Sequence, residues 1–183
     1  MNTAAATQPT QRLFFACWPS PEFARALAEI GASLAGDRAR VIAPADIHLT
    51  LAFAGNCTAA QRDCLIAAAD RYRGAPFDLA ITRLGWWARP RVVWAAPAET
   101  PAALHMLAET MAAALDACAL ALDDRPYQPH LTLIRGAATA PDLDSHGSWI
   151  WNVTRFGLYE SAPQRSGTRY RCLADWPIAP ATA

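Results

Sequence analysis

Apolar positions along the chain follow two periods, and these predict an alternation of strands and helices. Leu13 to Trp18 is apolar and aromatic-rich, as in a strand, and the prolines at 19 and 21 then mark a turn and a helix start. Four apolar residues follow at helical spacing and form one stripe: Phe23, Leu27, Ile30 and Leu34. The ordered part of the chain therefore opens with a strand that leads directly into an amphipathic helix.

The rest of the chain continues this alternation. We expect further strands over residues 47–53, 77–84, 91–95 and 130–135, near 149–160 and over 168–174, and further helices over 59–73 and 101–122. The segment 101–122 carries leucines and methionine on one helical face, as in a helix packed on a sheet. Strands that alternate with helices predict an α/β or α+β protein.

One four-residue sequence, His-Leu-Thr-Leu, occurs twice, at His48 to Leu51 and at His130 to Leu133. Two copies are too few for a solenoid, which needs at least about three repeats, but they suit two related lobes that face each other, one copy in each half of the chain. Side chains alternate between the faces of a strand, so each histidine shares a face with the threonine of its copy, and the leucines take the other face. Packing of the leucine faces on helices would bring two imidazoles and two hydroxyls together in a cleft.

This set of groups suits the cleavage of a phosphodiester. Histidine titrates near neutrality, so one imidazole can take a proton from water while the other gives a proton to the leaving oxygen. The hydroxyls of Thr50 and Thr132 can hold the non-bridging phosphate oxygens. In a regular strand Arg135 lies on the face opposite His130, but a twist or bulge at the strand end would return its guanidinium to the phosphate. A single His-x-Thr is typical of any half-exposed strand, and the doubling is what indicates a function.

Composition narrows the class of protein. The chain has 183 residues, 53% of them hydrophobic, and a formal net charge of zero, so it can bury a core but has no overall basic field for a long nucleic acid. We expect no membrane segment and no signal peptide. Five cysteines without a CxxC pair favour buried, reduced thiols in a cytoplasmic protein over a disulfide framework or a zinc site. Residues 1–11 are expected to form a disordered tail before a single bilobal domain over 12–183.

Two tetrads about eighty residues apart resemble the 2H phosphoesterase superfamily, and within it the RNA 2′,3′-cyclic phosphodiesterases, also called 2′-5′ RNA ligases. The resemblance covers nearly the whole chain, from Gln11 to Trp176, and extends to segments outside the tetrads. These segments are Arg12-Leu13-Phe14-Phe15-Ala16, Arg91-Val92-Val93-Trp94-Ala95, Arg125-Pro126-Tyr127-Gln128-Pro129 and Leu158-Tyr159-Glu160-Ser161.

The resemblance implies an α+β fold of two pseudo-symmetric lobes, each a mostly antiparallel sheet with outer helices, around a central cleft. It implies hydrolysis of RNA 2′,3′-cyclic phosphate ends to 2′-phosphate ends, without a metal or another cofactor. The expected ligands are RNA ends or small cyclic nucleotides, and the chain is expected to act as a monomer.

The resemblance also implies a role for each site residue. His48 would protonate the departing 3′ oxygen, and His130 would accept a proton from the attacking water. Thr50, Thr132 and Arg135 would hold the phosphate. Aromatic side chains stack on bases in single-strand binders, and three aromatic residues are candidates for this role: Phe14, Tyr127 and Trp94.

Other functions fit the same residues. The site would also serve ligation of RNA through a 2′-5′ bond, or cleavage of another cyclic or 2′-5′-linked nucleotide. A non-catalytic RNA- or nucleotide-binding module would keep the cleft without turnover. The pair Trp86-Trp87, with Arg89 and Arg91 nearby, could form an edge that stacks on nucleic acid, but two packed tryptophans at a β-turn explain this cluster as well, and we favour that interpretation.

Overall fold

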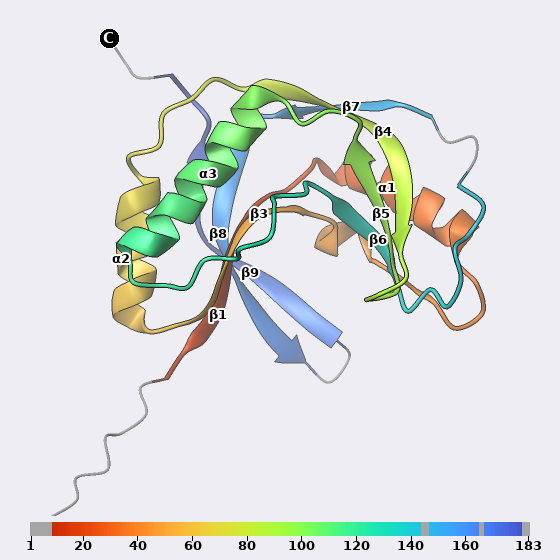
Figure 1. The fold of residues 1–183 in the computed structure, drawn as a ribbon, viewed down its shortest axis with the longest axis horizontal. Helices are drawn as coiled ribbons and strands as arrows, with labels where there is room; N and C mark the ends of the chain where they lie inside the picture. The colour runs from red at the N-terminus through yellow and green to blue at the C-terminus, as the bar shows by residue number, and fades with distance from the viewer. Residues whose placement is uncertain (1–8, 144–146, 165–166, 181–183) are drawn as a thin grey trace, which may run out of the picture.

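The computed structural model describes residues 9–143, 147–164 and 167–180, and an antiparallel sheet forms its centre (Figure 1). The strands pair in the order β7-β4-β5-β6-β3-β1-β8-β9, and the short β2 pairs with β6 outside this path. Their bounds are β1 Gln11–Cys17, β2 Arg40–Val41, β3 Leu49–Cys57, β4 Phe77–Trp87, β5 Val92–Pro97, β6 Leu131–Arg135, β7 Trp149–Val153, β8 Arg155–Gln164 and β9 Gly167–Pro177.

Within the described residues, three α-helices and a short 3₁₀ turn lie outside the sheet. Their bounds are α1 Pro21–Leu34, η1 Pro44–Asp46, α2 Ala59–Ala69 and α3 Ala102–Ala117. Local sequence accounts for the helix starts: Ser20 caps α1 by accepting from the backbone N–H of Phe23 at 3.2 Å, and Thr58 and Gln61 form a capping box on α2. The sequence therefore predicted where these helices begin, and α+β is the class of the fold.

The sheet consists of two halves that meet at β3 and β6. The single register pair between these strands joins Leu49 to Leu131. The β6 half contains β2, β4, β5 and β7 and is contacted by α1, whereas the β3 half contains β1, β8 and β9 and is contacted by α2 and α3. In Figure 1, α1 accordingly lies at the opposite side of the molecule from α2 and α3. Each half carries one His-Leu-Thr-Leu copy, so the two predicted lobes are present.

The lobes do not coincide with the two halves of the chain, which corrects the expected division. The strands β4 and β5 come before α3 in sequence but pair with β6 and β7 of the later segments, and β1 pairs with β8. The chain therefore crosses between the lobes more than once.

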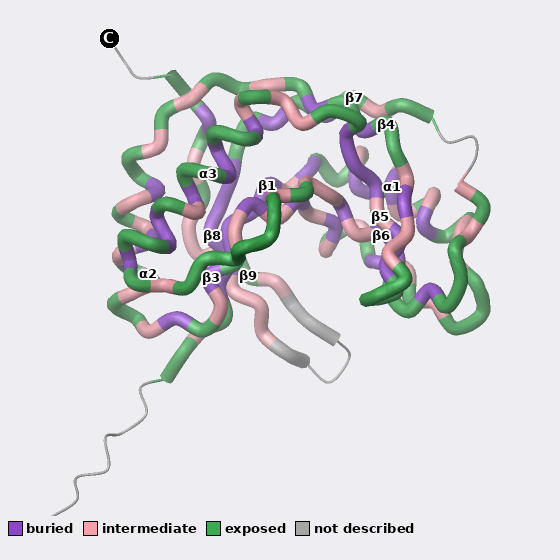
Figure 2. The backbone as a smooth tube through the Cα atoms, in the orientation of Figure 1, coloured by how far each residue is buried: buried purple, intermediate pink, exposed green. Residues whose placement is uncertain are grey.

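The leucines of both tetrads lie in the core, as the alternation predicted. Leu49, Leu131 and Leu133 are fully buried and Leu51 nearly so. On α1, a Cβ placed at Gly31 would lie 3.2 Å from the carbonyl oxygen of Leu133, so the absence of a side chain there allows the helix to approach β6 closely. Figure 2 shows buried backbone running through the centre of the sheet and the helix faces turned toward it.

Several predicted boundaries were wrong at their ends. His48 and His130 each lie one residue before their strand and not inside it. The helix expected to reach residue 122 ends at Ala117, because Ala119 takes a left-handed conformation with φ of 56° that stops it. Of the predicted tail, residues 1–8 lie outside the described residues, and Gln11 already belongs to β1.

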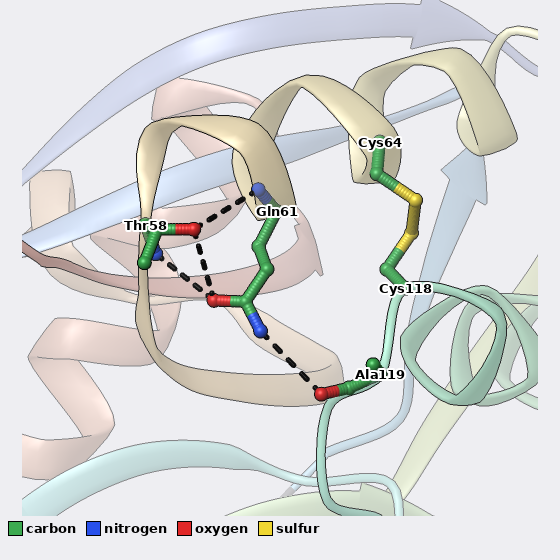
Figure 3. The surroundings of a disulfide bond; sticks show 5 residues. All are labelled: Thr58, Gln61, Cys64, Cys118 and Ala119. Atoms are coloured by element: carbon green, nitrogen blue, oxygen red, sulfur yellow. Dashed lines mark hydrogen bonds between the residues drawn. A yellow bond between two sulfur atoms is a disulfide. The ribbon is translucent and has the colours of Figure 1, made fainter.

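The cysteine prediction was wrong for three of the five residues. Cys64 on α2 and Cys118 at the end of α3 form a disulfide, and Cys172 is exposed, whereas Cys17 and Cys57 are buried free thiols. Gln61 of the α2 capping box also donates to the carbonyl of Ala119, next to this disulfide (Figure 3). The absence of a CxxC spacing could not reveal the bond, because its two cysteines are 54 residues apart and are brought together by helix packing. In the described part of the chain, no helix is long and apolar enough to cross a membrane.

Candidate active site

The ring of His48 is oriented by the turn that precedes β3. Its Nδ1 lies 2.7 Å from the carbonyl oxygen of Asp46, the last residue of η1. Since a carbonyl can only accept, Nδ1 carries the proton, and in the neutral ring Nε2 is left with a free lone pair. The backbone of the turn thus selects the tautomer in which Nε2 can accept or deliver a proton.

The ring of His130 is held in the same way. Its Nδ1 lies 2.9 Å from the carbonyl oxygen of Gln128, again two residues before the histidine. The segment in front of it is tied to the other lobe, because the hydroxyl of Tyr127 donates to the carbonyl of Thr50 at 3.1 Å. The two copies of the motif therefore present matched imidazoles on backbones that are linked by a hydrogen bond.

The pairing of Leu49 with Leu131 places the polar groups of the motif next to each other. In an antiparallel ladder, the residue before one member of a pair lies across from the residue after the other member. Extending the register by one residue on each side sets His48 across from Thr132 and Thr50 across from His130. Both threonines are half-buried, on the face opposite the buried leucines. The two motif copies thus meet at this pair, with their threonines on the face opposite the buried leucines.

A bulge at the second leucine of the motif decides where Arg135 points. Val93 pairs with Ile134 but Trp94 pairs with Thr132, so Leu133 has no partner on β5. This extra residue resets the alternation, and Arg135, across from Val92, shares a face with Thr132. The first copy has the equivalent irregularity, in which Leu51 has no partner on β1. The bulge considered from sequence is present, and it puts the guanidinium on the histidine face.

Burial and nearby positive charge hold both histidines toward their neutral forms. Burial is the main cause that lowers the pKa of His48 from 6.5 to about 4, and the charges of Arg135 and His130 lower it further, against the hydrogen bond to Asp46. Burial also lowers the pKa of His130, with Arg135 again contributing. The influence of Arg135 on both rings agrees with its position beside the pair. A bound anion would oppose these effects.

Two aromatic rings that were not predicted as site residues, those of Trp18 and Trp87, complete the histidine environments. The indole of Trp18 stacks on His48 with ring centroids 4.6 Å apart and planes at 18°, and its Nε1 donates to the carbonyl of Ala45 in η1 at 3.0 Å. Trp87 meets His130 edge-on at 4.6 Å. Trp87 was interpreted from sequence as a packed tryptophan at a β-turn, and in the structure it also contacts the His130 ring. The proline-flanked position of Trp18, after β1, offered no signal of this role.

The candidate stacking residues differ in accessibility. Phe14 is 2% exposed and its ring lies 5.2 Å from that of His48, so it packs behind the histidine and presents no open face. Tyr127 and Trp94 are half-buried and line cavities beside His130. The Nε1 of Trp94 is buried without a hydrogen-bond partner.

His130 lines two cavities. One, of about 650 Å³, extends from Thr50 and His130 along β3 to α3, and the other, of about 360 Å³, lies over β4 and β5. Trp87, Tyr127 and Gln128 line both. Thr50 and His130 line the larger cavity, whereas His48, Thr132 and Arg135 line neither. Together, two imidazoles with free Nε2 atoms, two hydroxyls and a guanidinium can bind a phosphate and move protons to and from it. Over the described ranges, no group of three His, Cys, Asp or Glu residues could hold a metal ion.

Comparison with known proteins finds relatives over nearly the whole chain. Residues 18–94 match the family model described as LigT like Phosphoesterase. The RNA 2′,3′-cyclic phosphodiesterase of Escherichia coli (strain K12) is 34% identical over 92% of this chain and 97% of its own length. The enzyme of the same name from Thermus thermophilus is 30% identical over 91% of this chain and 90% of its own length. The crystal structure of E. coli LigT complexed with 3′-AMP matches with a TM-score of 0.87 at 34% identity, over 92% of this chain and 98% of that one.

Proposed function

The chain belongs to the LigT-like phosphoesterases, the family of RNA 2′,3′-cyclic phosphodiesterases, and we propose that it converts RNA 2′,3′-cyclic phosphate ends to 2′-phosphate ends between His48 and His130. The observation that carries the proposal is the matched pair of imidazoles. Each donates through Nδ1 to the carbonyl two residues before it and keeps Nε2 free, and each directly precedes one of the strands that pair at Leu49 and Leu131.

In the proposed reaction, the oxygen of a water molecule attacks phosphorus as the bond from phosphorus to the 3′ oxygen breaks. His130, neutral at Nε2, accepts the proton that the water loses, and His48, protonated at Nε2, gives a proton to the departing 3′ oxygen. After the reaction His130 is protonated and His48 is neutral, so proton exchange with solvent restores the starting protonation states. Thr50, Thr132 and Arg135 hold the non-bridging oxygens, on which charge accumulates in the transition state.

The acid role of His48 requires a proton that the free protein does not hold at neutral pH. Burial lowers the pKa of this imidazole to about 4. A phosphate anion placed beside His48 stabilises the charged ring, so substrate and proton are taken up together. For the base role, a neutral His130 is ready in the free protein, since burial lowers its pKa as well.

An oligonucleotide that ends in a 2′,3′-cyclic phosphate tests the proposal. We expect turnover to a 2′-phosphate end, and a loss of at least about a hundredfold in kcat for His48→Ala and for His130→Ala, the lower range for removing a general acid or base. Thr50→Val and Thr132→Val should raise KM and lower kcat, whereas Thr110→Val, an exposed helical threonine whose hydroxyl donates to Met106, is the matched control. A 3′-phosphate product would contradict the proposed bond breakage, and full activity in both histidine variants would contradict the mechanism.

We also propose that the chain acts as a monomer in the cytoplasm. We further propose that it needs no metal ion, which the family resemblance supports. The structure pairs Cys64 with Cys118, and disulfides persist mainly in oxidising compartments, so the redox state of this pair in the cell tests the cytoplasmic proposal. Alkylation of the protein in intact cells followed by mass spectrometry addresses the compartment, since reduced Cys64 and Cys118 are expected for a cytoplasmic protein.

A further inference from the structure

Phe53 occupies the position in the first motif copy that Arg135 occupies in the second. Each lies five residues after its histidine and two after the bulged leucine. Phe53 pairs in register with Phe14, and their ring centroids are 5.9 Å apart, so it lies on the histidine side of the sheet. It is nevertheless 54% exposed. A large aromatic side chain on this face, open to solvent, is not explained by packing of the core.

Phe53 lines the larger cavity, which also contains Thr50 and His130. The cavity therefore reaches two of the groups proposed to contact the phosphate, and its lining extends from them along β3 and α3. Most of its remaining wall in this direction is apolar: Leu51, Ala52, Ala108, Ala112, Leu115 and Leu122. At about 650 Å³, it is within the usual size range of small-ligand sites.

The charges in this wall favour an uncharged ring over a phosphate as the occupant. Two carboxylates, those of Glu109 and Asp123, contribute to the wall. The arginine there, Arg125, donates to Asp123 through Nε at 2.8 Å. An anion would meet two carboxylates, whereas a base can stack on the phenyl ring and offer its N–H groups, which all four bases have, to them.

The position of Phe53 along the strand indicates which base would reach it. Three residues separate it from Thr50, or about 10 Å of extended chain. The base attached to the ribose of the cyclic phosphate is separated from that phosphate by the ribose alone. The preceding base lies one ribose and one phosphate further away. We propose that Phe53 is the stacking platform for the base on the 5′ side of the nucleotide that carries the cyclic phosphate, an inference that rests on the proposed function.

A platform for the preceding base makes the enzyme prefer oligonucleotides over mononucleotides. The quantity to measure is the ratio of kcat/KM for a dinucleotide with a 2′,3′-cyclic phosphate end to kcat/KM for the corresponding nucleoside 2′,3′-cyclic phosphate. This ratio is independent of the concentration of active enzyme, so partial unfolding of a variant does not change it. Base–aromatic stacking is sequence-tolerant, so the preference should hold for all four preceding bases.

Phe53→Ala should lower this ratio at least about fivefold, the lower end of what a base–aromatic stack contributes in single-strand binders. Phe53→Leu, which keeps an apolar side chain without a flat ring, should lower it similarly, and Phe53→Trp should retain it. Met106→Ala is the matched control, because Met106 is a 63% exposed apolar residue of α3 that does not line the cavity. A dinucleotide with an abasic 5′ position should give the same ratio with wild type and Phe53→Ala.

The two proposals fail in different ways. If the wild-type protein turns over neither substrate, the proposed function is wrong. If both substrates are turned over and the ratio is the same for wild type, Phe53→Ala and Phe53→Leu, the base subsite is wrong and the proposed function stands. A drop in the ratio that persists with the abasic dinucleotide also overturns the stacking role, because it would show that Phe53 contacts something other than the base.

Discussion

Lowering the pH should tighten the binding of anions at the two-histidine site, and the effect should depend on His48. Burial, together with the charges of Arg135 and His130, lowers the pKa of this imidazole from 6.5 to about 4. The protonated ring is therefore disfavoured in the free protein by about 3 kcal/mol, at about 1.4 kcal/mol per pKa unit. An anion that sits between the two histidines stabilises the protonated ring and raises its pKa.

The sign and size of the effect follow from linkage. When anion binding raises the pKa of a group, protonation of that group strengthens binding. The gain in affinity is complete below the pKa of the free protein, and it is lost as the pH rises to the pKa of the complex. If the anion restores the ordinary value of 6.5, the affinity falls about tenfold per pH unit between about pH 4 and 6.5. From about pH 5 to 6.5 the loss amounts to about fifteenfold, and from about pH 5 to the plateau above pH 6.5 it amounts to about thirtyfold.

Sulfate is a suitable probe, because it keeps its charge over this range. Isothermal titration calorimetry at constant ionic strength gives the dissociation constant at each pH, and the proton uptake can be checked by repeating the titration in buffers of different ionisation enthalpy. His48→Asn should remove most of the slope and retain weak binding through the remaining groups. An affinity that does not change with pH, or a slope retained in His48→Asn, would refute the proposed place of His48 beside the anion.

The remaining predictions concern the groups around the pair. Trp18→Ala removes the stack on the His48 ring and the hydrogen bond to the carbonyl of Ala45 in η1, so it should lower kcat at least about tenfold, with a smaller change in KM, and alter the pH profile. Trp18→Phe keeps an aromatic ring against His48 and should recover most of kcat. Cys118→Ala should lower the free energy of unfolding, measured in urea, by about 4 kcal/mol, since the bond closes a long loop. The free protein should lose stability as the pH falls from 6.5 toward 4, because unfolded His48 binds the proton more readily. A chelator should leave the rate unchanged; loss restored by a divalent ion would contradict the metal-free proposal.

Local sequence was enough to predict which polar groups share a strand face and much of the secondary structure. The doubled tetrad predicted two imidazoles on one face and buried leucines on the other, because side-chain alternation depends on the strand alone. The start of α1 was predicted for a similar reason: Pro21 and the apolar stripe act within a few residues of each other. The resemblance to a family added the reaction, which a two-histidine pattern leaves open.

The properties that make the site work depend on residues far apart in the chain. The bulge that turns Arg135 toward the histidines is set by the pairing of β6 with β5, and the low pKa of His48 is set by burial among side chains from several strands. The stacking of Trp18, the disulfide between α2 and α3 and the cavity beside Phe53 likewise arise from packing. The sequence by itself determined which groups are present and which face of a strand they share. Only the tertiary structure decided their distances, burial and charge environment, because these depend on contacts that no local pattern encodes.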